Sequence, residues 1–253
     1  MNIIVCIKQV PKTTNVKIDL KTGRIIREGI PSIINPDDKN AMEEAIKIKE
    51  LIPSKITVIT MGPPQAEEAL REAIAMGADE GILLSDIMFA GSDSWSTSNV
   101  LASAIKKIGA YDLILCGRQA IDGDTAQVPP ELAESLGIPQ ITYAQKIEIL
   151  SGKVKVEKET EEGYNIVEAP LPVLITCNSN INNPRYPTLI GLNNAFEKDL
   201  IRWNAKDLNI SKEDVESLTY VKKTFKPAAK GKGTMLKGSM QEMANELAKI
   251  LKK

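Results

Sequence analysis

Apolar runs and amphipathic stretches alternate along the first half of the chain. Four runs are nearly continuous in apolar side chains, as in strands that are covered on both faces. They are residues 2–10, 56–61, 81–84 and 112–116. Between them, apolar positions recur every three or four residues at 66–74 and 100–108, which is the spacing of one helix face. Strand, loop and helix in repeated order predict a doubly wound, mainly parallel α/β sheet.

Turn and capping signals mark further elements. Residues 35–38, Asn-Pro-Asp-Asp, combine a turn former, a proline and two carboxylates, which favour the start of a helix. Another helix is predicted from about Pro129 to Leu136. Residues 16–19 and 24–27, joined by a turn that contains glycine, predict a surface hairpin.

The pattern changes after residue 140. Four short segments predict antiparallel additions at the edge of the sheet. They are residues 144–149, 153–158, 164–168 and 172–177. From about residue 184 the chain is rich in proline and glycine, and we expect it to be irregular up to one last helix. The apolar residues of that helix have no neighbouring element of their own to pack against, which favours packing on another chain or domain.

This change of pattern suggests two domains. We expect an α/β domain over residues 1–190, followed over residues 191–253 by an extended arm that ends in a helix. Residues 221–253 contain nine lysines and two glutamates, whereas the rest of the chain has an acidic surplus. A basic segment can bind nucleic acid or an acidic partner. We favour docking on a partner, because no aromatic residue is interspersed among the lysines after Lys226.

Overall composition is that of an ordinary globular protein. Of the 253 residues, 43% are hydrophobic and 26% are charged, and no apolar run approaches the roughly 20 residues that cross a bilayer. The apolar start lacks the basic segment and cleavage site of a secretory leader, so we interpret it as a buried first strand. A cytoplasmic protein without a membrane span is expected.

Histidine is absent from the sequence, and this restricts the chemistry. Without histidine, Ser-His and Cys-His nucleophile pairs are excluded, and the commonest transition-metal ligand is missing. The three cysteines, Cys6, Cys116 and Cys177, follow apolar runs without CxxC spacing, which favours buried structural thiols over a redox or metal role. We therefore expect no catalytic side chain and no metal, and assign any chemistry to a bound cofactor.

The most informative loop follows the predicted strand at 112–116 and leads into a helix. That geometry can direct backbone N–H groups at an anion. Its two glycines permit a tight backbone, and its arginine can neutralise phosphate. Its two aspartates suit either sugar hydroxyls or bonds that hold the loop itself. The residues are Gly117, Arg118, Gln119, Ala120, Ile121, Asp122, Gly123, Asp124, Thr125, Ala126 and Gln127. The alternative is an ordinary turn with helix caps, since neither a Walker loop nor a GxGxxG fingerprint is present.

Two other strand ends are weaker candidates. Residues 90–98, Ala-Gly-Ser-Asp-Ser-Trp-Ser-Thr-Ser, resemble faintly the SGGxDS phosphate loop of ATP pyrophosphatases, but that loop follows a first strand. Here the segment follows a later strand, and it is equally typical of a helix N-cap. Residues 6–11 together with Asn35 and Pro36 lie where an adenine could fit between strand ends, or are plain strand and cap residues.

Taken together, the segments resemble the β subunit of electron transfer flavoproteins over nearly the whole chain. The matching segments are 5–11 (VCIKQVP), 35–38 (NPDD), 61–66 (MGPPQA), 75–79 (AMGAD), 117–127, 155–176 and 184–189 (PRYPTL). The resemblance implies a Rossmann-like domain of the adenine nucleotide α-hydrolase kind, a heterodimer with an α subunit, and electron transfer between dehydrogenases and other redox partners.

Two kinds of β subunit exist in that family. One holds a structural AMP, while the single working FAD lies in the α subunit. The flavin-bifurcating kind holds FAD in the β subunit, oxidises NADH to NAD, and delivers electrons to a low-potential acceptor such as ferredoxin or flavodoxin and to a partner dehydrogenase. Residues 122–125 (DGDT) and 89–93 (FAGSD) with Thr97 resemble the bifurcating kind. Three residues differ from that pattern: Ala90 and Ser92 stand where glycine and alanine are expected, and Pro129 stands where glycine is usual.

The resemblance assigns cofactor contacts residue by residue. It places Cys6 and the 35–38 stretch near the adenosine, with Met61 lining that pocket, and it wraps 117–128 around the phosphates and sugar. The full set of expected binding residues is Cys6, Lys8, Asn35, Asp37, Asp38, Met61, Phe89, Gly91, Ser92, Ser94, Thr97, Gly117, Arg118, Gln119, Ala120, Ile121, Asp122, Gly123, Asp124, Thr125, Ala126, Gln127 and Val128. The rival functions are an ATP-using enzyme and a stand-alone nucleotide-sensing module of the same fold.

Overall fold

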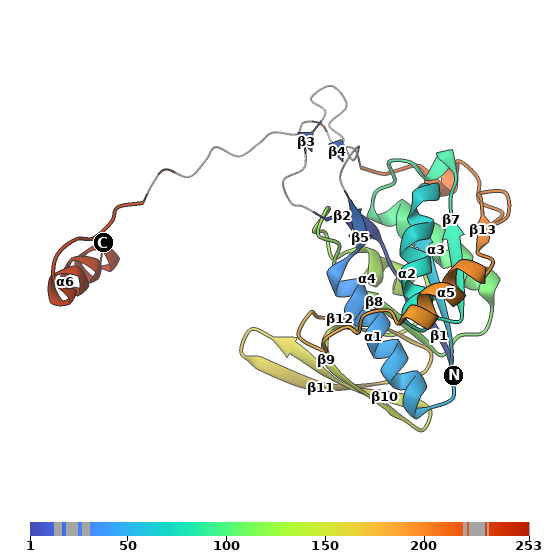
Figure 1. The fold of residues 1–253 in the computed structure, drawn as a ribbon, viewed down its shortest axis with the longest axis horizontal. Coiled ribbons are helices and arrows are strands. Elements are labelled where there is room, and N and C mark those ends of the chain that lie inside the picture. Colours follow the sequence, from blue (N-terminus) through green and yellow to red (C-terminus); the bar gives the residue numbers. More distant parts are fainter. Residues whose placement is uncertain are drawn as a thin grey trace. The chain divides into compact units, whose positions relative to one another are not determined.

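The computed structural model describes residues 1–12, 17–18, 25–26, 31–219, 222, 231 and 233–252. The chain divides into two compact units, Met1–Tyr220 and Val221–Lys253 (Figure 1). The first unit includes residues 191–219, which the sequence assigned to the arm. Whether the remaining segment docks on a partner stays a prediction.

A nine-stranded sheet forms the centre of the first unit, in the order β11-β10-β9-β12-β8-β1-β6-β7-β13. Its strands are β1 (Asn2–Cys6), β6 (Lys55–Met61), β7 (Glu80–Leu84), β8 (Leu113–Gly117), β9 (Gln140–Leu150), β10 (Lys153–Thr160), β11 (Gly163–Pro170), β12 (Val173–Cys177) and β13 (Ile201–Trp203). Two short antiparallel pairs lie apart from it: β2 (Gln9–Pro11) with β5 (Ser32–Ile34), and β3 (Lys17–Ile18) with β4 (Ile25–Ile26). The last pair confirms the antiparallel pairing of the predicted hairpin, whose turn lies outside the described residues.

Helices cover both faces of this sheet, so the doubly wound α/β prediction is confirmed. The helices of the first unit are α1 (Pro36–Leu51), α2 (Glu67–Met76), α3 (Ser94–Ile108), α4 (Val128–Leu136) and α5 (Leu189–Glu197), with 3₁₀ turns at Pro64–Ala66, Ile87–Phe89 and Glu213–Val215. Alternate residues of β8 face opposite sides. Leu113 and Leu115 pack in the cluster under α1 and α2, whereas Ile114 and Cys116 pack in the cluster under α3 and α4.

Three sequence expectations were wrong. The segment at 172–177 is no antiparallel edge addition, because β12 is fully buried and runs parallel between β8 and β9. The first strand does not continue to residue 10, since β1 ends at Cys6 and β2 pairs with β5 in a separate sheet. The stretch after 184 is not irregular throughout, because it contains α5 and the parallel edge strand β13. The antiparallel arrangement of β9, β10 and β11 is confirmed.

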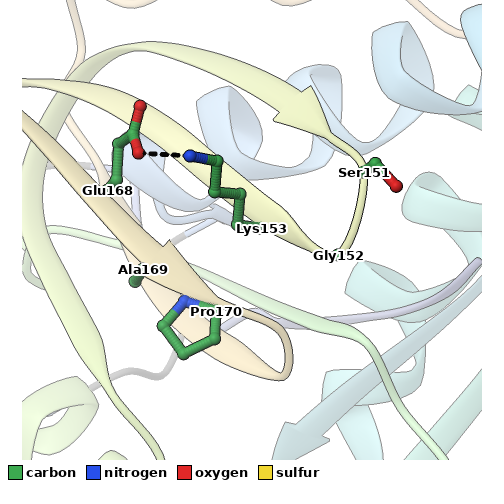
Figure 2. Close-up of a pocket in the computed structure, with 6 residues that line it drawn as sticks. All are labelled: Ser151, Gly152, Lys153, Glu168, Ala169 and Pro170. Atoms are coloured by element: carbon green, nitrogen blue, oxygen red, sulfur yellow. Dashed lines mark hydrogen bonds and ion pairs between the residues drawn. The ribbon is translucent and has the colours of Figure 1, made fainter.

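The antiparallel extension β9–β11 carries a shallow hollow of about 340 Å³ near its β9–β10 turn, lined by Ser151, Gly152, Lys153, Glu168, Ala169 and Pro170 (Figure 2). A Lys153–Glu168 ion pair of 2.6 Å crosses it. Strand β11 forms one edge of the sheet, and its Tyr164 and Ile166 side chains are exposed. The hollow lies on this hairpin, away from the strand ends that carry the predicted binding residues.

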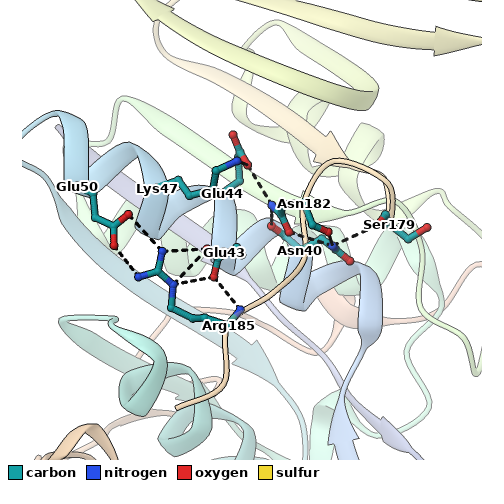
Figure 3. Close-up of polar contacts among 8 residues, drawn as sticks. All are labelled: Asn40, Glu43, Glu44, Lys47, Glu50, Ser179, Asn182 and Arg185. Carbon is teal, nitrogen blue, oxygen red and sulfur yellow. Dashed lines mark hydrogen bonds and ion pairs between the residues drawn. The ribbon is translucent and has the colours of Figure 1, made fainter. Parts of the chain in front are cut away.

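An ionic network fixes the chain after β12 to helix α1 (Figure 3). Arg185 donates through Nε and Nη2 to Glu43 at 2.9–3.1 Å and through Nη1 to Glu50 at 2.6 Å. Asn182 donates to Glu44 at 3.0 Å, and Asn40 donates to the Asn182 carbonyl at 2.9 Å. Glu43 is only 5% exposed, so Arg185 neutralises a buried charge.

The second unit contains helix α6 (Met240–Leu251). Ser239 and Glu242 form a reciprocal capping box at its start. Its apolar side chains are exposed, including Met240, Leu247 and Leu251. The final helix of the sequence prediction is therefore confirmed. None of the helices within the described part of the chain is both long and apolar enough to span a bilayer.

Candidate functional site

The candidate site lies at the carboxyl ends of β1 and β8, where Asp38 joins two strand ends to the start of α1. Its Oδ2 accepts the Lys8 backbone N–H at 2.8 Å, and its Oδ1 accepts the Gly117 N–H at 3.1 Å. Burial raises the pKa of Asp38 to about 7, although these two N–H donors favour the charged form. Lys8 also reaches across the site, because its Nζ lies 2.6 Å from Asp122 Oδ1.

Asn35 fixes the position of the 117–128 loop. Its side-chain Nδ2 donates to the Gln119 carbonyl at 2.8 Å, and its side-chain Oδ1 accepts the Ile121 N–H at 3.0 Å. Because Asn35 immediately precedes α1, the helix start and the loop form one structure. The structure thus brings together Lys8, Asn35, Asp38 and the loop, as the sequence predicted.

The two glycines of the loop have different surroundings. A Cβ on Gly117 would lie 2.3 Å from Asp38 Oδ1 and 2.7 Å from the backbone of α1, so only glycine allows this approach. A Cβ on Gly123 would meet nothing within 4 Å. Gly123 therefore faces open space, and the exposed Thr125 and Gln127 follow it. This is the part of the loop that has room for a ligand.

The loop bends through two left-handed residues, Asp124 with φ 53° and Ala126 with φ 54°. Neither is glycine, and such conformations are uncommon in other residues. Asp124 is held from within the loop, since Gln119 donates to its Oδ1 at 2.7 Å. Backbone strain of this kind clusters at ligand sites, where the surrounding structure maintains it.

Arg118 is the cation of the loop. Its Nε lies 3.5 Å from Asp37 Oδ2 and is buried without a hydrogen-bond partner, while 43% of its side chain is exposed. Burial raises the pKa of Asp37, and the nearby Arg118 opposes that shift. The guanidinium can therefore hold Asp37 on one side and a phosphate on the other.

Helix α4 offers fewer N–H donors than the strand–loop–helix pattern suggested. Pro129 and Pro130 follow Val128 in its first turn, and proline has no N–H. The Glu131 N–H is already bonded to the Gln127 carbonyl at 3.1 Å. An anion at this end of α4 would depend on the loop and on Arg118 more than on the helix. The two prolines were visible in the sequence, but their consequence was missed.

The second predicted loop meets the first. Ser94 lies at the start of α3, and its hydroxyl is 3.3 Å from Gln127 Oε1 and 3.2 Å from Glu131 Oε1. The other Glu131 oxygen is buried without a hydrogen-bond partner. Sequence reasoning missed Glu131, because a glutamate in a first helical turn reads as ordinary helix stabilisation.

Other predicted residues serve the fold in this structure. Phe89 and Met61 pack in the apolar cluster under α3. Ser92 and Thr97 donate to the carbonyls of Phe89 and Asp93, at 2.9 and 2.7 Å. Gly91 adopts φ 85° and forms part of the turn before α3. None of these contacts tests a ligand role, which stays a prediction for each residue.

The three thiols are free and buried, as the sequence indicated. Cys6 and Cys116 lie opposite each other on β1 and β8. The Cys6 thiol and burial raise the pKa of Cys116, and burial raises the pKa of Cys177. Raised thiol pKa values make these side chains poor nucleophiles. Within the described residues, no group of three or more acidic or cysteine side chains could hold a metal ion.

Residues 22–208 match the Electron transfer flavoprotein domain family. The chain belongs to the electron transfer flavoproteins. It is 49% identical over 255 residues to the electron transfer flavoprotein subunit beta of Clostridium acetobutylicum, covering all of this chain and 98% of the relative. It is 50% identical over 257 residues to the caffeyl-CoA reductase-Etf complex subunit CarD of Acetobacterium woodii, with the same coverage. The acryloyl-CoA reductase electron transfer subunit gamma of Anaerotignum propionicum is 43% identical over 264 residues, covering all of this chain and 99% of the relative.

As an electron transfer flavoprotein β subunit, the chain is one half of a heterodimer with an α subunit, and this family associates with flavin or nucleotide. The site residues fit such a group. In the same loop, Gly123 faces open space, Arg118 is a half-exposed cation, and Thr125 and Gln127 are exposed polar side chains. The aspartates of the loop suit hydroxyl groups of a sugar better than they suit a phosphate.

Proposed function

We propose that this β subunit holds FAD in the 117–128 loop, accepts a hydride from NADH there, and divides the electron pair between two acceptors. One electron goes to a low-potential carrier of the ferredoxin or flavodoxin type, and the other goes through the FAD of the α subunit to a partner dehydrogenase. The single observation that carries the proposal is the open space at Gly123, in a loop that Asn35 fixes and that also carries the half-exposed cation Arg118.

The relatives support an electron-transfer role beside a dehydrogenase or reductase. CarD is named as part of a caffeyl-CoA reductase complex, and the relative from Anaerotignum propionicum is named as the electron transfer subunit of an acryloyl-CoA reductase. Both extend over the whole of this chain. By analogy, we propose a reductase or dehydrogenase as a partner of this heterodimer.

The residues of the chain would bind and orient the cofactor. Arg118 would neutralise a phosphate, the backbone at Gly123 would approach the pyrophosphate closely, and Asp122 or Asp124 would accept hydrogen bonds from ribose or ribityl hydroxyls. Bound flavin supplies hydride acceptance and one-electron transfer. Since the sequence has no histidine, we assign no proton transfer to an imidazole.

A second candidate function is a β subunit that holds a structural AMP, with the working FAD in the α subunit alone. The start of α4 favours it, because Pro129 and Pro130 remove two N–H donors that a pyrophosphate would otherwise use. A single phosphate needs fewer donors. In either case we propose that α6 and its basic segment dock on the α subunit, since the apolar residues of α6 are exposed.

The deciding experiment is cofactor stoichiometry. The chain is co-expressed with its α subunit, the heterodimer is purified, and its cofactors are released by denaturation and quantified. Two FAD and no AMP per heterodimer would support the FAD proposal, which NADH titration in the presence of ferredoxin would then extend. One FAD and one AMP would refute it in favour of the AMP function.

A further inference from the structure

The last described stretch of the first unit crosses the start of α3. Residues 215–219, here called the strap, begin at the last residue of the 3₁₀ turn at Glu213–Val215 and lead in the sequence into the second unit at Val221. Val215 is buried in the cluster under α3, so the strap belongs to the packed fold. The sequence alone assigned it to the extended arm of residues 191–253.

Asp93 is the centre of the contact between the strap and the loop before α3. Its Oδ1 caps the helix by accepting the Ser96 N–H at 2.9 Å. Its Oδ2 accepts both the N–H and the hydroxyl of Thr219, each at 3.0 Å. Its own N–H donates to the Ser217 hydroxyl at 3.0 Å. One carboxylate therefore serves the helix and the strap at once.

Two more hydrogen bonds join the strap to α3 and to the loop before it. Ser217 donates to the Gly91 carbonyl at 3.3 Å, and Ser96 donates from a buried position to the Val215 carbonyl at 2.7 Å. Burial alone would raise the pKa of Asp93, but the bonds from Ser96 and Thr219 hold the pKa below its ordinary value. Asp93 is thus charged at neutral pH, and its hydrogen bonds are of the stronger, charge-assisted kind.

The residue next to Asp93 faces the other way. Ser94 contacts Gln127, at the end of the 117–128 loop, and Glu131, in the first turn of α4. At the start of α3, Asp93 therefore contacts the strap, and the adjacent Ser94 contacts the 117–128 loop. A displacement of this helix start changes both contacts together.

We propose that Asp93 is a positioning residue that couples nucleotide binding in the 117–128 loop to docking of the strap. This inference rests on the proposed function, in either its FAD or its AMP form. Because such coupling is reciprocal, a bound nucleotide stabilises the strap, and a docked strap raises nucleotide affinity by the same factor. The strap immediately precedes the segment that we assign to the α subunit, so cofactor occupancy and subunit contact would reinforce each other.

The test uses the purified heterodimer and three variants. Thr219→Val removes one strap bond and leaves the cap of α3 intact. Asp93→Asn retains a good N-cap residue and removes the charge, whereas Asp93→Ala removes both. Ser211→Ala is the matched control, because the Ser211 hydroxyl bonds only Asp214 of its own turn, at 2.7 Å. FAD, AMP and NADH affinities are measured by fluorescence titration or calorimetry, and hydrogen exchange is followed in the strap.

We expect Thr219→Val to weaken binding of the resident nucleotide roughly fivefold, the lower end of typical coupling between sites, and Asp93→Ala to weaken it more. Asp93→Asn should recover part of the loss, and Ser211→Ala should bind like the wild type. The nucleotide should slow exchange in the strap of the wild type and slow it less in Thr219→Val.

A purely structural Asp93 would lower the melting temperature without changing affinity. Wild-type affinity in Thr219→Val and Asp93→Asn, with strap exchange insensitive to nucleotide, would overturn the coupling and leave the proposed function intact. A wild-type heterodimer whose β subunit binds none of the three nucleotides would overturn both.

Discussion

Gly117 gives the sharpest test of how the site is built, because a single methyl group can be compared at two positions of one loop. In Gly117→Ala the new Cβ would lie 2.3 Å from Asp38 Oδ1 and 2.7 Å from two backbone atoms of α1. The Asp38 carboxylate must therefore move, and the strand end and the start of α1 must also separate, which strains the Asn35 bonds to the loop.

The expected cost follows from the contacts that are lost. Displacing the carboxylate breaks at least one of its two N–H bonds, at about 1.5–3 kcal/mol for a bond to a charged group, and overpacking adds about 1–3 kcal/mol. Replacing glycine by alanine within a strand stabilises the fold by roughly 0.5–1 kcal/mol, which offsets part of this cost. The net loss is about 2–5 kcal/mol, a large fraction of a stability of about 5–15 kcal/mol.

Urea unfolding of the heterodimer, followed by circular dichroism, measures this loss. Gly123→Ala is the control, since its Cβ meets nothing within 4 Å and its φ requires no glycine. It should unfold within about 0.5 kcal/mol of the wild type, as for surface substitutions generally, but bind nucleotide more weakly. If Gly117→Ala unfolds at the wild-type urea concentration, the close packing of β8 on the start of α1 is not what holds the site.

Three further changes have expected outcomes. Arg185→Ala leaves Glu43 buried without its cation and should cost about 3–5 kcal/mol of stability in urea unfolding, whereas Glu50→Gln, at an exposed position, should unfold close to the wild-type urea concentration. Because burial raises the pKa of Asp38 from 3.8 to about 7, the native state binds its proton more tightly than the unfolded state. Asp38 should therefore make the wild type lose stability as pH rises from about 4 to about 7; Asp38→Asn should lack that component in melts across this range, and an unchanged slope would refute the assignment. Pro130→Ala adds an N–H at the start of α4 and should tighten nucleotide binding roughly two- to tenfold, the worth of one hydrogen bond; equal affinity by titration would show that the phosphate lies elsewhere.

Much of the fold could be predicted because its signals are local. The i, i+3, i+4 spacing identified α2 and α3, and residues 35–38 identified the start of α1. The direction of a strand relative to its neighbours has no local signal, because it depends on pairing with segments far away in the sequence. The segment 172–177 is as apolar as any parallel strand, but it follows a hairpin, and only its pairing with β8 and β9 shows that it is interior. The edge strand β13 has three residues, too few for a periodic pattern.

The sequence predicted which loops come together at the site, but it did not predict the hydrogen bonds between them. Parallel strands place their carboxyl ends at one edge, so the convergence of residues 8, 35–38 and 117–124 followed from the fold class. The Asp93–Thr219 contact joins residues 126 positions apart, and the sequence signal at Asp93 is a cap that many loops share. Left-handed Asp124 and Ala126 also have no clear sequence signal, since neither is glycine.

The two edge strands of the central sheet, β13 and β11, differ in length and exposure. On one side the short β13 closes the edge at β7. On the other, β11 pairs with β10 without a bulge from residue 163 to 170 and presents its outer backbone groups, with Tyr164 and Ile166 exposed beside them. A long regular edge of this kind is where strands of separate molecules pair. Among the described strands, β11 is thus where we expect self-association to start when the protein is concentrated or stored, and a lysine at position 166 would be the first substitution to protect it.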